Sequence, residues 1–310
     1  MTAPTSPVAF RRFNALAVQQ WRLERGWFAS RLAEELNCTV TKVSYIEGAE
    51  RSISVNDMEK LLRVFEIPED QHPIYINAAK ASKQKGWWDK LPAGTIPPWF
   101  SLFVGLEAGA AEIRAFEGLV IPGLLQTPDY AAAVIAGGTA ELTTADIELR
   151  QRVRIGRQSV LDRQPEPLRL WAVIDEAALW RVVGNPMIHL AQLEHLLSVI
   201  KKYPRVTILV IPFSSGAHVG SQGSFTLMDF PWSHDPGVVY LENQYDSQFM
   251  EDKVPGKTVT ANDQEDGEVT KKPSPLAVHR LAWDHLVAKA LDPLGSEAKI
   301  EEVMKELKRR

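Results

Sequence analysis

The chain has 310 residues, of which 45% are hydrophobic and 24% are charged, a composition typical of globular proteins. Its single cysteine, Cys38, excludes an internal disulfide and a zinc site built from several thiolates. No apolar run of roughly eighteen residues is present, so no membrane-spanning segment is expected. The start, "MTAPTSPVAFRRFN", lacks the apolar core of a signal peptide, and we expect a cytoplasmic protein.

The net charge of −4 is distributed unevenly along the chain. Residues 1–85 hold 12 Lys and Arg against 10 Asp and Glu, a net charge of +2, and the remainder carries −6. A charge of +2 is small for a nucleic-acid-binding domain and argues against non-specific coating of DNA. Sequence-specific binding stays open.

The first 85 residues predict an all-α domain behind a short tail. Residues 1–11 are rich in Pro, Ser, Thr and Ala, which predicts a disordered tail. Over residues 12–85 apolar residues recur at helical spacing between short breaks, which predicts five helices. The third of these helices begins at Thr39, which suits an N-cap, and stops at Gly48.

The pattern beyond residue 85 mixes helix and strand. After the connector "WWDKLPAGTIPPWF" we expect a helix from Pro98 to Glu117 and another capped by Thr127. Four segments rich in β-branched and aromatic residues predict strands: "LRLWAVID", "RVTILVIPF", "GSFTLMDF" and "GVVYLEN". Residues 86–310 are therefore predicted to form an α+β domain with a small, mostly antiparallel sheet. Residues 252–275 are polar and turn-rich, and predict an exposed loop.

Several long segments resemble a known family of regulators. "LAEELNCTVTKVSYIEGAERSIS" is similar to the helix-turn-helix of Cro/phage-repressor-type (XRE) regulators. "KQKGWWDKLPAGTIPPWFSLFVGLEAGAAEIRAFEGLVIPGLLQTPDYA", "IDEAALWRVVG" and "VTILVIPFSSGAHVGSQGSFTLMDFP" resemble the second half of WhiJ-like regulators of actinobacteria. The resemblance covers about residues 14–295. It implies a five-helix DNA-binding head, an antitoxin-like C-terminal domain, and a small partner protein encoded by a neighbouring gene.

The segment from Thr39 to Glu47 matches the recognition helix of this family. Helical spacing turns Val43 and Ile46 inward and leaves the other side of the helix for DNA. Methyl groups suit thymine, hydroxyls suit base edges, and a tyrosine or a basic side chain suits phosphates. The candidate DNA-binding residues are Val40, Thr41, Lys42, Ser44, Tyr45 and Arg51.

The resemblance has two further implications for the head. Glu47 matches an acidic residue that forms a structural ion pair with an arginine of the first helix, here Arg22. Phe28 and Ala29 depart from the family, which has a Thr-Gln-type pair there whose Gln helps to hold the DNA backbone. We therefore expect modest affinity per head, and a homodimer that places two heads on a palindromic operator.

The segment "SSGAHVGSQGSF" raises the alternative of a hydrolase. Its order and spacing match no hydrolase motif, and its glycines fit a turn between strands, so no enzyme is expected. The residues of this rejected arrangement are Ser214, Ser215, His218, Ser221 and Asp229. His189 and His195 of one predicted helix do not face the same direction, and we expect neither a metal nor a cofactor.

The predicted function is that of a cytoplasmic, DNA-binding transcriptional regulator that lies on the nucleoid when it is bound. Its C-terminal domain would dimerise, bind a small partner protein, or both. Two other interpretations stay open. One is an antitoxin-like interaction module whose DNA binding is secondary or lost. The other is a ligand-gated sensor, for which "GAHVGSQGS" and "GLLQTPDY" supply a pocket or a strand edge.

Overall fold

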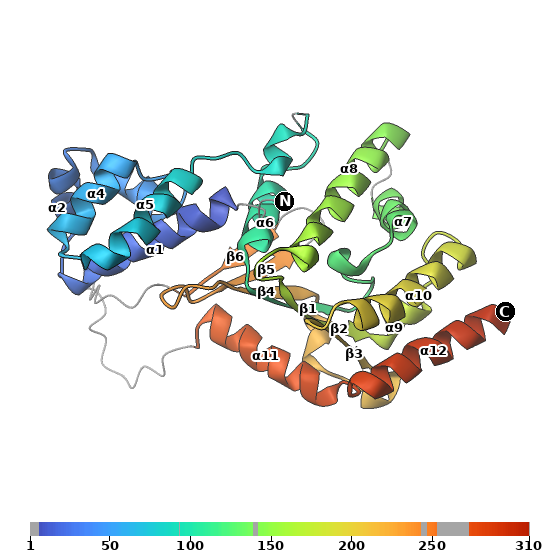
Figure 1. Cartoon of the computed structure of the whole chain (residues 1–310). Helices are drawn as coiled ribbons and strands as arrows, with labels where there is room; N and C mark the ends of the chain where they lie inside the picture. The colour runs from blue at the N-terminus through green and yellow to red at the C-terminus, as the bar shows by residue number, and fades with distance from the viewer. Residues whose placement is uncertain (1–5, 93, 139–141, 243–246, 253–272, 310) are drawn as a thin grey trace.

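The computed structural model describes residues 6–92, 94–138, 142–242, 247–252 and 273–309 (Figure 1). The N-terminal part of the chain is built from helices alone. These helices are α1 (Pro7–Glu24), α2 (Ala29–Leu36), α3 (Val40–Glu47), α4 (Val55–Val64) and α5 (His72–Ala81). Their apolar sides enclose a small core of their own, to which α1, α2, α3 and α4 all contribute buried residues. We call this part the head.

The first helix begins earlier than predicted. It starts at Pro7, so the predicted disordered tail over residues 1–11 is wrong for residues 7–11, and residues 1–5 lie outside the described residues. The Ser6 hydroxyl accepts a hydrogen bond from the Ala9 N–H at 3.2 Å, and Pro7 occupies the first turn, where no N–H is needed. The serine and proline that suggested a tail are therefore the start signal of a helix.

A six-stranded sheet organises the rest of the chain. Its order is β3-β2-β1-β4-β5-β6, with β1, β2 and β3 parallel and the pairings from β1 through β4 and β5 to β6 antiparallel. The predicted α+β architecture is confirmed, but the sheet is mixed, because helical crossovers connect β1 to β2 and β2 to β3. The strands are β1 (Glu112–Glu117), β2 (Arg169–Asp175), β3 (Val206–Ile211), β4 (Phe225–Asp229), β5 (Val238–Glu242) and β6 (Ser247–Met250).

Helices cover both faces of this sheet (Figure 1). On one face Trp283 and Leu286 of α11 pack against Val173 and Val239 of the strands. On the other face α6, α10 and α12 contribute to a larger core with the alternate strand residues. The helices of this part are α6 (Pro98–Gly109), α7 (Pro128–Gly138), α8 (Thr144–Arg157), α9 (Glu176–Trp180), α10 (Pro186–Lys202), α11 (Pro275–Lys289) and α12 (Pro293–Arg309).

The helix predicted from Pro98 to Glu117 is too long. It ends at Gly109 as α6, and β1 begins at Glu112. The segment "EIRAFE" has no strong local preference for a strand, but β2 and β4 pair with it on its two sides and impose the extended form. The four segments predicted as strands contain β2, β3, β4 and β5, whereas β6 was not predicted. Most of the predicted polar loop, residues 253–272, lies outside the described residues.

Helix α1 belongs to both parts of the molecule. Its first turns pack against α6 so closely that a Cβ at Gly109 would overlap the Cβ of Ala9. The ring of Phe13 stacks on Tyr75 of α5 at 5.2 Å and lies 4.9 Å from the ring of Trp232, which precedes β5. The head is thus joined to the sheet-containing part through a helix as well as through the connector.

Candidate nucleic-acid interface

The turn between α2 and α3 is set by local backbone chemistry. Asn37 ends α2 in the left-handed conformation, with φ of 50°, which asparagine tolerates better than most residues. Thr39 then caps α3, because its hydroxyl accepts a hydrogen bond from the Lys42 N–H at 3.2 Å. The Thr39 cap predicted from the sequence is therefore present, and it fixes where α3 begins.

Helix α3 has one buried side and one exposed side. Val43 and Ile46 face the core of the head, with 0% and 3% of their surfaces exposed. The residues predicted to contact DNA lie on the other side, where Val40 is 48% exposed and Thr41 and Ser44 are also exposed. Lys42 and Tyr45 are half-buried and flank this surface, and Arg51, just beyond the helix, is exposed.

Two of the predicted phosphate contacts already have partners within the head. The Lys42 ammonium lies 2.9 Å from a carboxylate oxygen of Asp57, in the first turn of α4. The Arg51 guanidinium lies over the ring of Tyr45, 4.8 Å from its centroid. Sequence reasoning missed Asp57, because the spacing of Ser54 and Asp57 marks the start of a helix but does not show that this start lies beside α3.

The predicted partners Arg22 and Glu47 lie together in a bidentate arrangement. The Arg22 Nε donates to Glu47 Oε1 at 2.6 Å and its Nη2 donates to Oε2 at 2.9 Å. The third nitrogen donates to the Trp27 carbonyl at 2.8 Å. The side chains of Arg22 and Glu47 are only 12% and 9% exposed, so the pair holds the end of α3 against α1 in a largely dry position.

The start of α2 is apolar and uncapped. Phe28 occupies the N-cap position, is 78% exposed, and offers no side-chain hydrogen bond to the helix. Ala29, the first helical residue, is half-buried against the core of the head. Neither residue supplies the polar side chain that would hold a phosphate at this helix end.

The rejected hydrolase residues do not converge in the structure. His218 Nε2 lies 3.0 Å from Asp175 Oδ2, whereas Asp229 binds Arg114 and Arg280 at 2.6 Å each. Two hydroxyls of this rejected arrangement bind other groups: Ser221 donates to the His218 carbonyl and Ser215 to the Lys289 carbonyl. Ser214 is exposed. Asp175 was missed, although it is the last residue of a predicted strand.

A group of charged side chains lies at the carboxyl end of β1. Burial raises the pKa of Glu117 to about 7, and the nearby Glu242 carboxylate adds to this rise while a hydrogen bond from Ser224 opposes it. Burial and the neighbouring Arg157 lower the pKa of Arg154 to about 10. Arg157 itself binds Glu107 through two hydrogen bonds of 2.7 and 2.8 Å. Glu117 therefore titrates near neutral pH.

A family comparison assigns the sheet-containing part of the chain. The model of DUF5753, described as a domain of unknown function, matches residues 100–259, which is more than half of the chain. The chain belongs to the DUF5753 family. Comparison with curated proteins and with solved structures gives no match.

The DUF5753 match leaves the head outside its limits. It begins within α6 and includes the whole described sheet, while α1 to α5, α11 and α12 lie beyond it. The match is compatible with a helix-turn-helix regulator and makes no statement about DNA. We use the name DUF5753 domain for the part of this chain from α6 onward, which comprises the matched residues together with α11 and α12.

The described residues of this DUF5753 protein were compared with the requirements of a membrane span and of a metal site. They contain no helix that is both long and apolar enough to cross a membrane. They also bring together no group of three or more His, Cys, Asp or Glu side chains suited to a metal ion. His189 is buried and bonds to the Leu179 carbonyl at 2.7 Å, and burial lowers its pKa.

Proposed function

We propose that this DUF5753 protein is a sequence-specific DNA-binding transcriptional regulator that places α3 in the major groove. The observation that carries the proposal is the two-sided character of α3. Val43 and Ile46 anchor it in the head, and the opposite side leaves Val40, Thr41 and Ser44 exposed. A short helix, a tight turn and a second helix with a free outer side is the arrangement by which helix-turn-helix proteins read DNA.

The exposed side chains of α3 suit the chemistry of the groove. Val40 and the Thr41 methyl offer apolar contacts to thymine, and the Thr41 and Ser44 hydroxyls can donate to or accept from base edges. Arg51, held over Tyr45, offers a charge to a phosphate. Because Asp57 neutralises much of the Lys42 charge, each head contributes few phosphate contacts and its affinity is modest.

The DUF5753 domain supplies the second half of the proposal. Modest affinity per head favours two heads acting together, so we assign to this domain dimerisation, binding of a small partner protein, or both. A homodimer reads a palindromic operator whose half-sites lie about one helical turn apart. The site of action is the nucleoid of the cytoplasm.

Fluorescence anisotropy of the full chain tests the proposal. The probes are a duplex from the upstream region of its own gene and a scrambled duplex of equal length, each across a salt series. Tight binding to the first alone is the expected result. Thr41→Ala should weaken it by roughly five-fold or more, because a good base contact is worth ~1–3 kcal/mol. Tyr45→Ala should also weaken it, because it removes a phosphate contact and the ring under Arg51. Lys80→Ala, an exposed change on α5, is the control. Equal binding of both duplexes refutes sequence-specific reading.

The exposed Phe28 favours a second candidate, an antitoxin-like interaction module in which DNA binding is secondary or lost. An apolar side chain that is 78% exposed beside the recognition helix suits a protein contact better than a phosphate contact. Capture of the small protein encoded next to the gene, lost in Phe28→Ser and kept in Lys80→Ala, would support this candidate. The anisotropy experiment separates the two, since only the regulator distinguishes the duplexes.

A further inference from the structure

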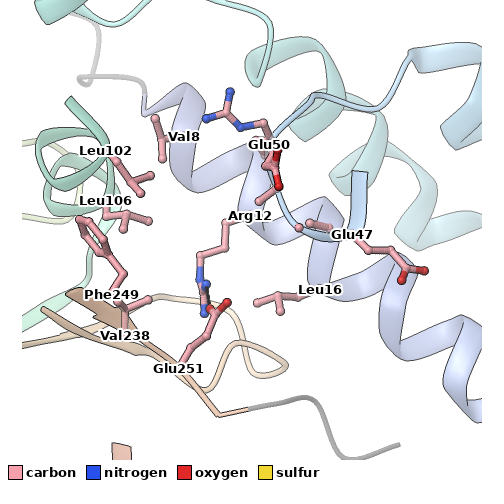
Figure 2. Close-up of a pocket in the computed structure, with 14 residues that line it drawn as sticks. Val8, Arg12, Leu16, Glu47, Glu50, Leu102, Leu106, Val238, Phe249 and Glu251 are labelled. Atoms are coloured by element: carbon pink, nitrogen blue, oxygen red, sulfur yellow. Dashed lines mark hydrogen bonds and ion pairs between the residues drawn. The ribbon is translucent and has the colours of Figure 1, made fainter. Parts of the chain in front are cut away.

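A cavity of about 360 Å³ lies where the head meets the DUF5753 domain (Figure 2). Its walls come from three places: α1, residues 47–50 where α3 ends, and the side of the domain formed by α6, β5 and β6. The volume falls in the range of roughly 300–1,000 Å³ that small-molecule sites occupy. The exposed residues of α3 that are proposed to read DNA do not line it, so the cavity is a separate site.

The wall contributed by the DUF5753 domain is largely apolar. Leu102 and Leu106 of α6 face the cavity together with Val238 and Phe249 of the sheet, as Figure 2 shows. Leu106 and Val238 are buried, whereas Leu102 is 37% exposed and still meets water. Such a wall favours a ligand with an apolar body, which gains free energy by leaving water.

The two arginines that line the cavity are poor partners for an anion. Arg12 donates to both oxygens of Asp235, at 2.8 and 2.9 Å, and forms an ion pair with Glu251. Only 9% of the Arg12 side chain is exposed. The Nε of Arg11 is inaccessible to solvent, and the nearby Asp89 carboxylate offsets part of the Arg11 charge. The positive charge of the lining is therefore largely balanced before any ligand binds.

Carboxylates outnumber guanidinium groups around the cavity. The lining holds three carboxylates, those of Glu47, Glu50 and Glu251, against its two arginines. The charged partners of these groups outside the lining add two carboxylates and one guanidinium, that of Arg22. Five carboxylates and three guanidinium groups give this region a net charge of −2. A negative potential attracts cations and repels anions, most strongly beside apolar walls that exclude water.

Glu50 is a carboxylate of the lining that a ligand can reach. Its Oε1 lies 3.5 Å from the position that a Cβ would take at Gly48, so the side chain folds over the wall of the cavity. Glu50 is exposed, and within the described part of the chain no hydrogen bond or ion pair holds its carboxylate. The other two carboxylates of the lining already pair with arginines. An ammonium group therefore gains most at Glu50, where it displaces only water.

We propose that this cavity binds an organic cation, a protonated amine with its ammonium on Glu50 and its apolar body against Leu102 and Phe249, and that the bound cation changes the affinity of the head for DNA. The part about DNA rests on the proposed function, whereas the part about binding does not. The cation touches residues 47–50 and the DUF5753 domain at the same time. Its affinity therefore depends on how the two are placed, and by linkage DNA and the cation change each other's affinity by the same factor.

Isothermal titration calorimetry of the full chain tests the binding site. The probes are octylamine and 3-phenylpropylamine, which are both protonated at pH 7 like a lysine side chain. Octanol and 3-phenylpropanol carry the same apolar bodies without a charge, and octanoate and 3-phenylpropanoate carry the opposite charge. The amines should bind roughly five-fold more tightly than the alcohols, as a partly exposed ion pair allows, and the acids should bind more weakly than the alcohols.

A charge-removing variant tests the place of the ammonium. Glu50→Gln keeps the shape of the side chain and should remove the preference for amines over alcohols. Glu59→Gln makes the same change at an exposed position of α4 and should keep it. Both glutamates are exposed, so both variants should fold, which circular dichroism verifies. Failure of the amines to bind the wild type, or a preference for amines that survives Glu50→Gln, overturns the site.

A second variant tests the apolar wall without changing the charge. Leu102→Trp adds bulk at a partly exposed position of the cavity and should weaken binding of the amines and the alcohols alike. Leu281→Trp, at an exposed position on α11, is the matched control. Equal affinity of the amines for these two variants overturns the placement of the apolar body.

The anisotropy experiment, repeated with the amine that binds, tests the effect on DNA. The expected result is a change in affinity for the upstream duplex of about five-fold or more, absent in Glu50→Gln. Specific DNA binding that ignores a bound amine overturns the regulation and leaves the site. Amine binding that depends on Glu50, in a protein that reads no DNA, refutes the proposed function and leaves the site.

Discussion

Replacing Arg22 by alanine should destabilise the head by about 3–5 kcal/mol, the cost typical of removing one partner from a buried ion pair. This cost lies well above that of an exposed ion pair, because the Arg22 and Glu47 side chains are only 12% and 9% exposed. The variant loses two hydrogen bonds to Glu47 and one to the Trp27 carbonyl. It also leaves the Glu47 carboxylate largely buried and without a positively charged partner.

Hydrogen–deuterium exchange of the full chain measures this effect where it occurs. The peptides that cover α2 and α3 report the free energy of opening the head, and the sheet peptides of the DUF5753 domain serve as an internal reference. Arg25→Ala, at the residue that caps the end of the same helix, is the matched control. Arg25 is 40% exposed and lies 3.2 Å from an exposed Glu66, so its loss should cost at most about 1 kcal/mol.

A double variant separates the pair from its parts. Arg22→Met combined with Glu47→Leu removes both charges and keeps apolar volume, so it should be more stable than either single variant. If Arg22→Ala costs no more than Arg25→Ala, or if the effects of the single variants simply add, the pair does not hold α3 against α1 as argued.

Three further predictions concern stability. Ile46→Ala should destabilise the head by ~2–5 kcal/mol, because Ile46 is 3% exposed, and a urea melt should show it with unchanged far-ultraviolet circular dichroism before unfolding. Gly109→Ala should lower the free energy of unfolding by ~1–3 kcal/mol, because the added Cβ overlaps Ala9, even though alanine favours helices. A rise in melting temperature would contradict the close packing of α1 on α6. The folded-state pKa of Glu117 is raised from about 4.5 to about 7, so its contribution is most favourable below pH 4.5 and is lost as pH rises through 7. Glu117→Gln should therefore be more stable than wild type above pH 7, by up to about 3 kcal/mol, and a flat difference between pH 4.5 and 8 would contradict this.

The elements of the head could be predicted because their signals are local. Thr39 as N-cap, Val43 and Ile46 at helical spacing, and the stop at Gly48 all lie within one short segment. The core-facing side of α3 follows from that spacing alone. The contact between Lys42 and Asp57 joins two different helices, and no local pattern shows that their first turns meet.

The elements that sequence reasoning missed depend on contacts between distant segments. β1 extends because β2 and β4 flank it, and the local sequence of the strand is compatible with a helix. The rejected arrangement paired His218 with Asp229, which is near in sequence, yet Asp175 is near in space because it ends β2. The cavity beside Arg11 requires α1, the end of α3 and the sheet together, so no single segment of the sequence predicts it.

Helix α1 would carry a change in the DUF5753 domain to the head, because it packs against both. It has 18 residues and so spans roughly 27 Å as one rigid rod. Near its start Ala9 packs on α6 and Arg11 lines the cavity, and near its end Arg22 holds Glu47 of α3. A flexible linker would let the two parts move independently, whereas a helix shared by both cannot tilt at one end without moving the other. A change of packing where α1 meets α6 would therefore alter the placement of α3 through α1, independently of the connector that precedes α6.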